Sequence, residues 1–448
     1  MSINTKLVVF NASSQAMQNI TTIVSHNSDW GNNKPSDNFN NVTIGPFAYR
    51  SMEEDIDSDA DSANFQMTIT YANGDQIVIT SNQLKALQNG ASQFSPTGTS
   101  AENYRSYIIA GSNDLFFAVF PNVNSQTWMK STWDSLSGKQ LCQIALPGSH
   151  DAGMYKINYS TALSTTDNTR TQSMKIGDQL NNGSRFFELR PMIWKDETDS
   201  SDMYLGHFAP PGSSIGLQGS LGEKLSDVLN DIKSFIINPN NDHEIVVLRF
   251  EQYRDIDNDG ADFSDNQKSD LRKLVLKHLG PYLYTSSDPN CNLGYVNVQD
   301  MYDANTRIIA VFDDFSGHLD CTTGIFSYGA NDSTKSYRLL DDYANTDIFN
   351  DMLSDQTNKF NDFTSSDASM FLLSWTLTMK STDFVSTSIE NLATVANSNL
   401  WYGIFEMFKN EAFLTYKIPN IIYVDFVDSK YYLAEAAYCL NSFATGYY

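Results

Sequence analysis

A chain of 448 residues, 41% of them hydrophobic, is long enough for about two domains of ordinary size, each with its own buried core. Its 29 Lys and Arg against 53 Asp and Glu leave a net charge of -24, which would repel a nucleic-acid backbone over most of the surface. We therefore expect no nucleic-acid partner, and any anionic substrate needs a local cationic pocket.

The cysteines and the first residues of the chain bear on its compartment. The four cysteines lack CxxC spacing, so we expect mostly free thiols, with one disulfide left open. The N-terminal stretch MSINTKLVVFNASS has neither the cationic start nor the apolar core of a signal peptide. We expect a soluble monomer that is secreted and acts at a membrane surface, with a cytoplasmic location as the alternative.

Residues 1–126 carry short runs in which polar and apolar residues alternate, among them KLVVFNA, ITTIVSH and DLFFAVFPN. In FQMTITYANGDQIVIT an Asn-Gly pair separates two such runs, which is typical of a β-hairpin. We predict an all-β sandwich. It has no acid-base set of its own, so we expect it to target a membrane or a sugar, or only to stabilise the second domain.

Residues 127–448 show a different pattern, in which short apolar runs alternate with longer segments that suit helices. Helices are predicted over 221–238 and 266–283. The strand candidates are LCQIALPG, SRFFELRPMI, MYLGHF, EIVVLRFE, RIIAVFDD, MFLLSWTL and NIIYVDFV. This alternation predicts an α/β domain with a parallel sheet closed into a TIM-like (β/α) barrel.

Polar residues lie at the ends of four of the predicted strands, and strand ends are where parallel barrels carry their active sites. They are His150 and Asp151, Glu188 and Arg190, His207, and Asp425. Glu188 and Arg190 are two residues apart, so they lie on the same side of their strand. Asp425 is the single carboxylate in the apolar run IIYVDFV, so we expect it to have a cationic or imidazole partner.

Two imidazoles with separate carboxylate partners and an arginine form a set suited to cleaving a phosphodiester. One histidine can take a proton from the attacking hydroxyl, the other can give one to the leaving oxygen, and a guanidinium can hold the phosphate. The alternatives are a structural histidine and a simple ion pair between Glu188 and Arg190. The glycines and proline around His150 in PGSHDAG favour the catalytic interpretation there.

The motifs then resemble those of a known family. WMKSTWDSL, ALPGSHDAGMY, GSRFFELRP, LGHFAP and NIIYVDFV are similar, in order and approximate spacing, to the X-domain region of bacterial-type phosphatidylinositol-specific phospholipases C. The resemblance covers residues 127–430. It implies a distorted TIM barrel in which the inositol 2-hydroxyl of phosphatidylinositol, or of a glycosylated relative, attacks phosphorus. The products would be diacylglycerol and a 1,2-cyclic inositol phosphate.

The resemblance also implies a role for each residue. His150 would be the general base, supported by Asp425, and His207 the general acid, supported by Asp151. Arg190 would contact the phosphate, where relatives that use calcium carry a metal-binding aspartate, so we expect catalysis without a metal or other cofactor. In VLRFEQY, Arg249 and Glu251 share one side of a strand, and we expect Arg249 and Glu188 to bind substrate.

An acidic segment, DIDNDGADFSDN at residues 255–266, has the oxygen ligands and the glycine of a calcium loop at its first six positions. Its twelfth residue is Asn266, where a bidentate glutamate is expected, and a predicted strand precedes it in place of a helix. We favour a solvated loop over a structural calcium site.

Two other functions stay open. A metal-dependent phosphodiesterase acting on another phospholipid would lose its activity in a chelator. A non-catalytic, toxin-like protein that only binds a lipid head group would bind membranes without turnover. Both use the same barrel, so only chemistry at the strand ends separates them from a phospholipase.

Overall fold

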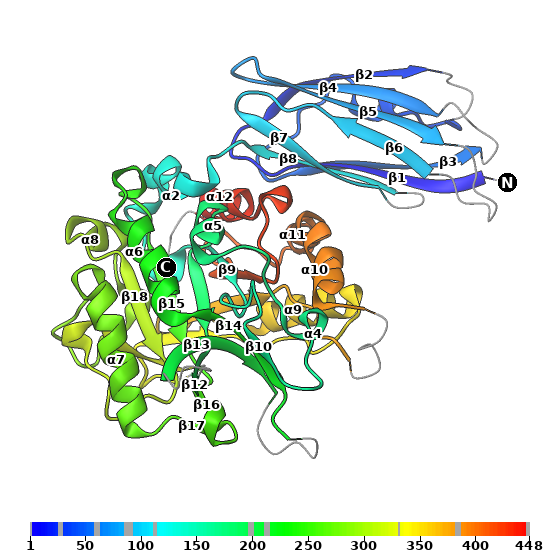
Figure 1. The fold of residues 1–448 in the computed structure, drawn as a ribbon. Helices are drawn as coiled ribbons and strands as arrows, with labels where there is room; N and C mark the ends of the chain where they lie inside the picture. Colours follow the sequence, from blue (N-terminus) through cyan, green and yellow to red (C-terminus); the bar gives the residue numbers. More distant parts are fainter. Residues whose placement is uncertain are drawn as a thin grey trace. The chain divides into compact units, whose positions relative to one another are not determined.

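The computed structural model describes residues 2–25, 30–57, 63–84, 93–110, 114–195, 201–209, 216–329, 332–380 and 387–444 (Figure 1). The chain divides into two compact units. The first is Met1–Val123 with Ser398–Glu411, and the second is Asn124–Asn397 with Ala412–Tyr448. The sequence predicts one boundary after residue 126, whereas the structure places it after Val123 and adds a distant segment to the first unit.

The first unit contains two four-stranded sheets, ordered β3-β1-β8-β7 and β2-β4-β5-β6. The strands are β1 (Ser2–Asn11), β2 (Met17–Ser25), β3 (Tyr49–Asp57), β4 (Asn64–Tyr71), β5 (Gln76–Leu84), β6 (Gln93–Gly98), β7 (Tyr104–Ala110) and β8 (Asp114–Pro121). Side chains from both sheets form one buried cluster that includes Trp30, Phe65 and Phe117. The predicted hairpin joins β4 to β5, and Gly74 in its turn has a φ of 88°.

Helix α11 (Leu400–Lys409) belongs to the first unit because its aromatic side chains pack on the outer face of the first sheet. Trp401 stacks on Phe120 with ring centroids 4.1 Å apart, and Phe405 lies 5.6 Å from Phe10 and 5.2 Å from Phe116. Strand β8 is therefore buried on both faces, which explains why DLFFAVFP is almost continuously apolar.

The second unit is built on a closed barrel of parallel strands, ordered β11-β15-β18-β19-β20-β21-β22-β9. These are β9 (Leu146–Ser149), β11 (Phe186–Leu189), β15 (Val246–Phe250), β18 (Ile308–Phe312), β19 (Ile325–Gly329), β20 (Tyr337–Leu340), β21 (Met370–Ser374) and β22 (Ile421–Val424). The predicted TIM-like barrel is thus confirmed. We call the end at which these strands finish the carboxyl rim, and the opposite end the amino rim.

Helices surround the barrel strands, as Figure 1 shows for α6, α7 and α8 around β15 and β18. They are α5 (Ile176–Asn181), α6 (Leu225–Ile237), α7 (Asp265–Leu279), α8 (Val298–Asp303), α9 (Phe349–Asp362), α10 (Ile389–Ser398) and α12 (Leu433–Phe443). Apolar residues of α6 recur every three or four positions and are buried against the strands, which gives the amphipathic pattern its physical reason. The two predicted helices correspond to α6 and α7.

A second sheet, which we call the accessory sheet, is formed by segments that follow barrel strands, in the order β10-β14-β13-β12-β16-β17. Its strands are β10 (Tyr159–Ser160), β12 (Pro191–Lys195), β13 (Ser201–Phe208), β14 (Gly219–Lys224), β16 (Arg254–Asp255) and β17 (Ala261–Asp262). The predicted strand MYLGHF is β13, so it is not a barrel strand. It pairs antiparallel with β12, which continues directly from β11.

The segment at 255–266 forms the β16-β17 pair and the start of α7. The carboxylate of Asp255 accepts from Gln267 Nε2 at 2.6 Å, that of Asp257 accepts from the Lys195 backbone N–H at 2.8 Å, and Asp262 pairs with Arg254. The preference for a solvated loop over a calcium site stays a prediction. Within the described residues there is no cluster of His, Cys, Asp or Glu arranged to hold a metal, and no disulfide joins the four cysteines.

Among the described residues, none of the helices is both long and apolar enough to span a membrane.

Candidate active site

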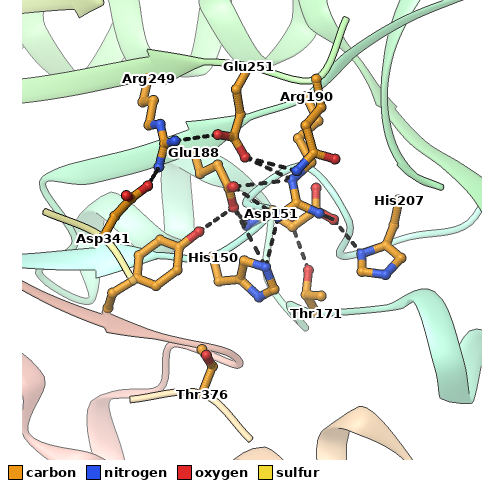
Figure 2. Close-up of polar contacts among 12 residues, drawn as sticks. His150, Asp151, Thr171, Glu188, Arg190, His207, Arg249, Glu251, Asp341 and Thr376 are labelled. Atoms are coloured by element: carbon orange, nitrogen blue, oxygen red, sulfur yellow. Dashed lines mark hydrogen bonds and ion pairs between the residues drawn. The ribbon is translucent and has the colours of Figure 1, made fainter. Parts of the chain in front are cut away.

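Neighbouring strands bring the predicted residues together at the carboxyl rim. Strand β9 pairs with β11 on one side and with β22 on the other. His150 and Asp151 follow β9, Glu188 and Arg190 lie at the end of β11, and Asp425 follows β22. His207 reaches the same place from β13 of the accessory sheet, and Figure 2 shows it across Asp151 from His150.

His150 is held by Asp425. Its Nδ1 lies 2.7 Å from Asp425 Oδ1, and the carboxylate is buried while the imidazole is 20% exposed. Because a carboxylate accepts hydrogen bonds, Nδ1 carries the hydrogen and Nε2 keeps a lone pair. Burial opposes the charged imidazole, but Asp425 and then Glu188 outweigh it and raise the pKa of His150 above its ordinary value.

The turn after β9 has a left-handed residue and two tightly packed glycines. Asp151 has a φ of 41°, and its backbone N–H donates to Glu188 Oε2 at 2.8 Å. A Cβ on Gly153 would lie 2.3 Å from Leu205 Cδ1, and one on Gly148 would lie 2.7 Å from Ile421 Cγ2. The glycines of PGSHDAG therefore let this turn approach both β13 and β22.

Asp151 links the second histidine to the arginine. Its Oδ2 lies 2.6 Å from His207 Nδ1 and 3.2 Å from Arg190 Nη1. The carboxylate is fully buried, and its Oδ1 has no hydrogen-bond partner among the described residues. His207 is thus fixed in the same tautomer as His150, with Nε2 directed away from its carboxylate.

Arg190 lies between the two histidines. Its Nη2 is 3.0 Å from His150 Nε2 and 2.9 Å from Glu188 Oε1, and its Nε is 3.5 Å from Glu251 Oε1 (Figure 2). Burial alone would lower its pKa, but Asp151, Glu188 and Glu251 raise it well above the usual value. The guanidinium is therefore a permanent positive charge at the rim.

The pKa values of Glu188 and Glu251 are shifted in opposite directions by this environment. Burial raises the pKa of both carboxyls, but Arg190 leads the effects that bring that of Glu188 well below its usual value. For Glu251 the neighbouring Glu188 adds to burial, and the pKa is raised well above the usual value. The two groups therefore titrate as a pair, with the negative charge held on Glu188.

Arg249 organises a second charged cluster on the same rim. Its Nη2 lies 2.5 Å from Glu251 Oε2 and its Nη1 2.7 Å from Asp341 Oδ2, while Asp313 Oδ2 is 3.2 Å from Nη2. The guanidinium also lies over the ring of Tyr328 at 3.9 Å, and its Nε has no partner in the part of the chain described. Asp313 and Asp341 are partly exposed, so a ligand can reach their oxygens.

Several of these residues are absent from the sequence-based site. Asp313 directly follows β18, so the rule used for the other strand ends could have identified it. Asp341 follows β20 and Tyr328 lies on β19, two strands that the sequence pattern did not predict. Tyr423, on β22, donates a hydrogen bond to Glu188 Oε2. It was overlooked because one aromatic residue in an apolar strand is usually part of the core.

The arrangement can perform acid-base chemistry at a charged centre. Two imidazoles on opposite sides of Arg190 each keep Nε2 free of their supporting carboxylate. One can accept a proton while the other donates one, and the guanidinium can stabilise an anion between them.

Comparison with known proteins confirms the predicted resemblance in sequence. No protein-family model matches the chain. It is 24% identical over 205 residues, 43% of its length, to a PI-PLC X-box domain-containing protein of Dictyostelium discoideum, and 31% identical over 126 residues to a PI-PLC X domain-containing protein of the same organism, 25% of its length. A variant-surface-glycoprotein phospholipase C of Trypanosoma cruzi is 24% identical over 160 residues, 30% of this chain. The chain spans 23%, 20% and 39% of these relatives.

The phosphatidylinositol-specific phospholipase C of Listeria monocytogenes superimposes with a TM-score of 0.48 at 16% identity, covering 71% of this chain and 99% of that one. A variant of the Staphylococcus aureus enzyme also has a TM-score of 0.48 at 16% identity, covering 70% and 98%.

Proposed function

We propose that the chain is a phosphatidylinositol-specific phospholipase C-like lyase that cleaves phosphatidylinositol or a glycosylated relative. The observation that carries this proposal is the pair of imidazoles, His150 and His207, each bonded through Nδ1 to a buried carboxylate on either side of Arg190. The sequence similarity to PI-PLC X-domain proteins supports the same class of substrate.

The first proton transfer uses His150. Asp425 holds its Nδ1 hydrogen, so Nε2 accepts the proton of the inositol 2-hydroxyl. The hydroxyl oxygen then bonds to phosphorus while the bond between phosphorus and the glycerol oxygen breaks. His207 donates a proton from Nε2 to that glycerol oxygen. The products are diacylglycerol and a 1,2-cyclic inositol phosphate, and a proton exchange with water restores both histidines.

Arg190 would hold the phosphate oxygens and stabilise the charge that grows on them. Its position between the two imidazoles, and the buried carboxylates that fix it, support this role. We propose that the guanidinium replaces a metal and that catalysis requires no cofactor.

We assign binding of the lipid head group to the cluster around Arg249. Its partners Asp313 and Asp341 are 30% and 24% exposed at the side chain, so they can accept hydrogen bonds from ring hydroxyls. Glu188 contributes indirectly, because its oxygens already accept from Arg190, from the Asp151 N–H and from Tyr423.

The first unit would serve the enzyme as a β-sandwich that targets it to a phospholipid surface. Two sheets around one aromatic core support this fold assignment. We propose that the protein acts as a secreted monomer at such a surface.

The test is turnover of phosphatidylinositol vesicles in excess EDTA, followed by phosphorus NMR, for the wild type, His150→Ala and His207→Ala. His278→Ala, on the outer helix α7, is the matched control. We expect a cyclic phosphate signal from the wild type and the control, and none from the two site variants.

Other outcomes would contradict the proposal. Silence in EDTA with activity restored by calcium would indicate a metal-dependent phosphodiesterase. Vesicle binding without turnover under either condition, retained by His150→Ala, would indicate a head-group-binding protein.

A further inference from the structure

Tyr423 is a buried residue of the rim that the proton-transfer scheme does not use. It lies on β22, two residues before Asp425, and is 7% exposed. Its phenol donates a hydrogen bond to Glu188 Oε2, and its ring centroid lies 5.3 Å from that of His150. One side chain therefore contacts both the base histidine and the carboxylate next to it.

The backbone around Tyr423 leaves room for its ring. A Cβ on Gly148 would lie 3.3 Å from Tyr423 Cδ2, closer than an ordinary van der Waals contact. The same Cβ would lie 3.4 Å from Phe186 Cδ1, and the Phe186 ring meets that of Tyr423 edge-on, with centroids 6.2 Å apart. Strands β9 and β11 thus fix the ring, and the direction of the phenol is set by packing.

The phenol of Tyr423 fixes the position of Glu188 Oε2, an oxygen that could compete with the substrate for His150 Nε2. Glu188 Oε2 accepts from Tyr423 and from the Asp151 N–H, and it lies 3.7 Å from His150 Nε2, beyond hydrogen-bond distance. If it moved closer, Oε2 would bind the protonated imidazole and occupy the nitrogen that must accept the substrate proton. Burial and then Glu188 raise the pKa of Tyr423 well above its usual value, so the phenol remains a neutral donor.

We propose that Tyr423 is a positioning residue, which holds Glu188 out of hydrogen-bond reach of His150 Nε2. Among the described residues, that nitrogen then has only the guanidinium of Arg190 at 3.0 Å beside it, and no carboxylate competes with the attacking hydroxyl for it. This inference rests on the proposed function, because it assigns Tyr423 a task in the same proton transfer.

Several charged groups act on His150 at once. Asp425 faces Nδ1 from the end of β22, while Glu188 and Arg190 face Nε2 from β11. Behind them, Glu251 contacts Arg190 from the end of β15. Tyr423 is the neutral member of this set. Removal of its hydroxyl therefore lets the Glu188 carboxylate move but leaves the number of charges around His150 unchanged.

The test is Tyr423→Phe, which keeps the ring and removes only the hydroxyl. Arg190 keeps Glu188 ionised through two hydrogen bonds, so the released Oε2 should approach His150 Nε2 and stabilise the imidazolium. We expect the titration of the labelled His150 imidazole, followed by NMR, to move to higher pH. In turnover, kcat/KM should fall about tenfold at the acidic end of its pH profile and recover toward wild type at the alkaline end, with KM changed less than about twofold.

Tyr253→Phe is the matched control, because Tyr253 is buried and its phenol donates to the Phe250 carbonyl at 2.7 Å, away from both histidines. It should leave the His150 titration and the pH profile unchanged. An unmoved His150 titration in folded Tyr423→Phe would overturn the inference. The NMR readout needs no turnover, so a wild type that cleaves no phosphatidylinositol would overturn the proposed function while the titration still decides the role of Tyr423.

Discussion

Arg185 and Arg190 border the same short strand, β11, and differ in how their charge is satisfied. Arg185 stands at the amino rim and is fully buried. Its guanidinium donates to Glu244 through Nε and Nη2, and to the backbone carbonyls of Leu180, Ser184 and Gln126. Every nitrogen of the group has a protein acceptor, so this arginine has no capacity left for a ligand.

Arg190, at the carboxyl rim, has a different set of partners. They are titratable side chains, namely His150, Asp151, Glu188 and Glu251, and the arginine side chain is 11% exposed. Burial dominates at Arg185 and lowers its pKa, whereas the carboxylates outweigh burial at Arg190. A buried charge alone therefore does not mark a functional site; the partners and the remaining access to solvent do.

Arginine-to-lysine substitutions at the two positions test this difference most strongly. Lysine keeps the charge but loses the planar array of donors. We expect Arg190→Lys to lower kcat/KM about 100- to 1,000-fold while unfolding stays close to wild type. Arg185→Lys should lose about 3 kcal/mol of unfolding free energy, and its folded fraction should keep wild-type turnover. Denaturant unfolding and phosphatidylinositol turnover measure the two effects. Equal losses of turnover in both variants would contradict the distinction between the rims.

Asp425→Asn tests whether the carboxylate of Asp425 sets the pKa of His150, the proposed base. Burial lowers the pKa of His150, and Asp425 is the leading group that raises it, so removal of the carboxylate charge should lower it. The acidic limb of kcat/KM against pH should move to lower pH, while the maximum falls about 100-fold because the imidazole loses its fixed tautomer. This shift is opposite in direction to that expected for Tyr423→Phe.

The control for this prediction is Asp428→Asn, three residues further along the chain, where the carboxylate accepts from the Lys430 N–H. It should leave the profile in place. An acidic limb that stays fixed in Asp425→Asn would mean that another group than His150 is the base.

The sequence pattern was sufficient to predict those barrel strands that alternate with helices. It failed for β19 and β20, because only the seven residues 330–336 separate them, too few for a helical crossover. It also took β13 for a barrel strand, because an apolar run does not show whether its neighbour is parallel or antiparallel. Helix α11 could not be assigned to the first unit, since its partners in β1 and β8 lie some hundreds of residues away in sequence.

The candidate site was more predictable than the fold because its residues stand at strand ends. The predicted contacts of His150 with Asp425 and of His207 with Asp151 are present, although their catalytic roles stay a proposal. The sequence could not show that Glu188 is occupied by protein donors, because those donors come from three separate segments. Its expected contact with substrate stays a prediction, although protein donors already bind both of its oxygens.

Glu251 and Glu188 offer the finest test, since both are buried at the carboxyl rim. Glutamine mimics a protonated carboxyl, so Glu251→Gln should change the unfolding free energy by less than about 1 kcal/mol at neutral pH, whereas Glu188→Gln should lose about 3 kcal/mol. The raised pKa of Glu251 means that its protonation stabilises the fold in acid, and that this contribution is lost as the pH rises. Glu251→Gln should therefore gain stability relative to wild type toward alkaline pH.

For Glu188 the direction is reversed. Its lowered pKa means that its charge stabilises the fold above the ordinary carboxyl range, and that this contribution is lost as the pH falls through that range. The deficit of Glu188→Gln should accordingly shrink in acid. Equal losses for both variants at neutral pH would show that both carboxylates are ionised. Arg190 and Arg249 would then face two glutamate charges rather than one, in addition to Asp151, Asp313 and Asp341, which would leave less positive charge at the rim for a substrate phosphate.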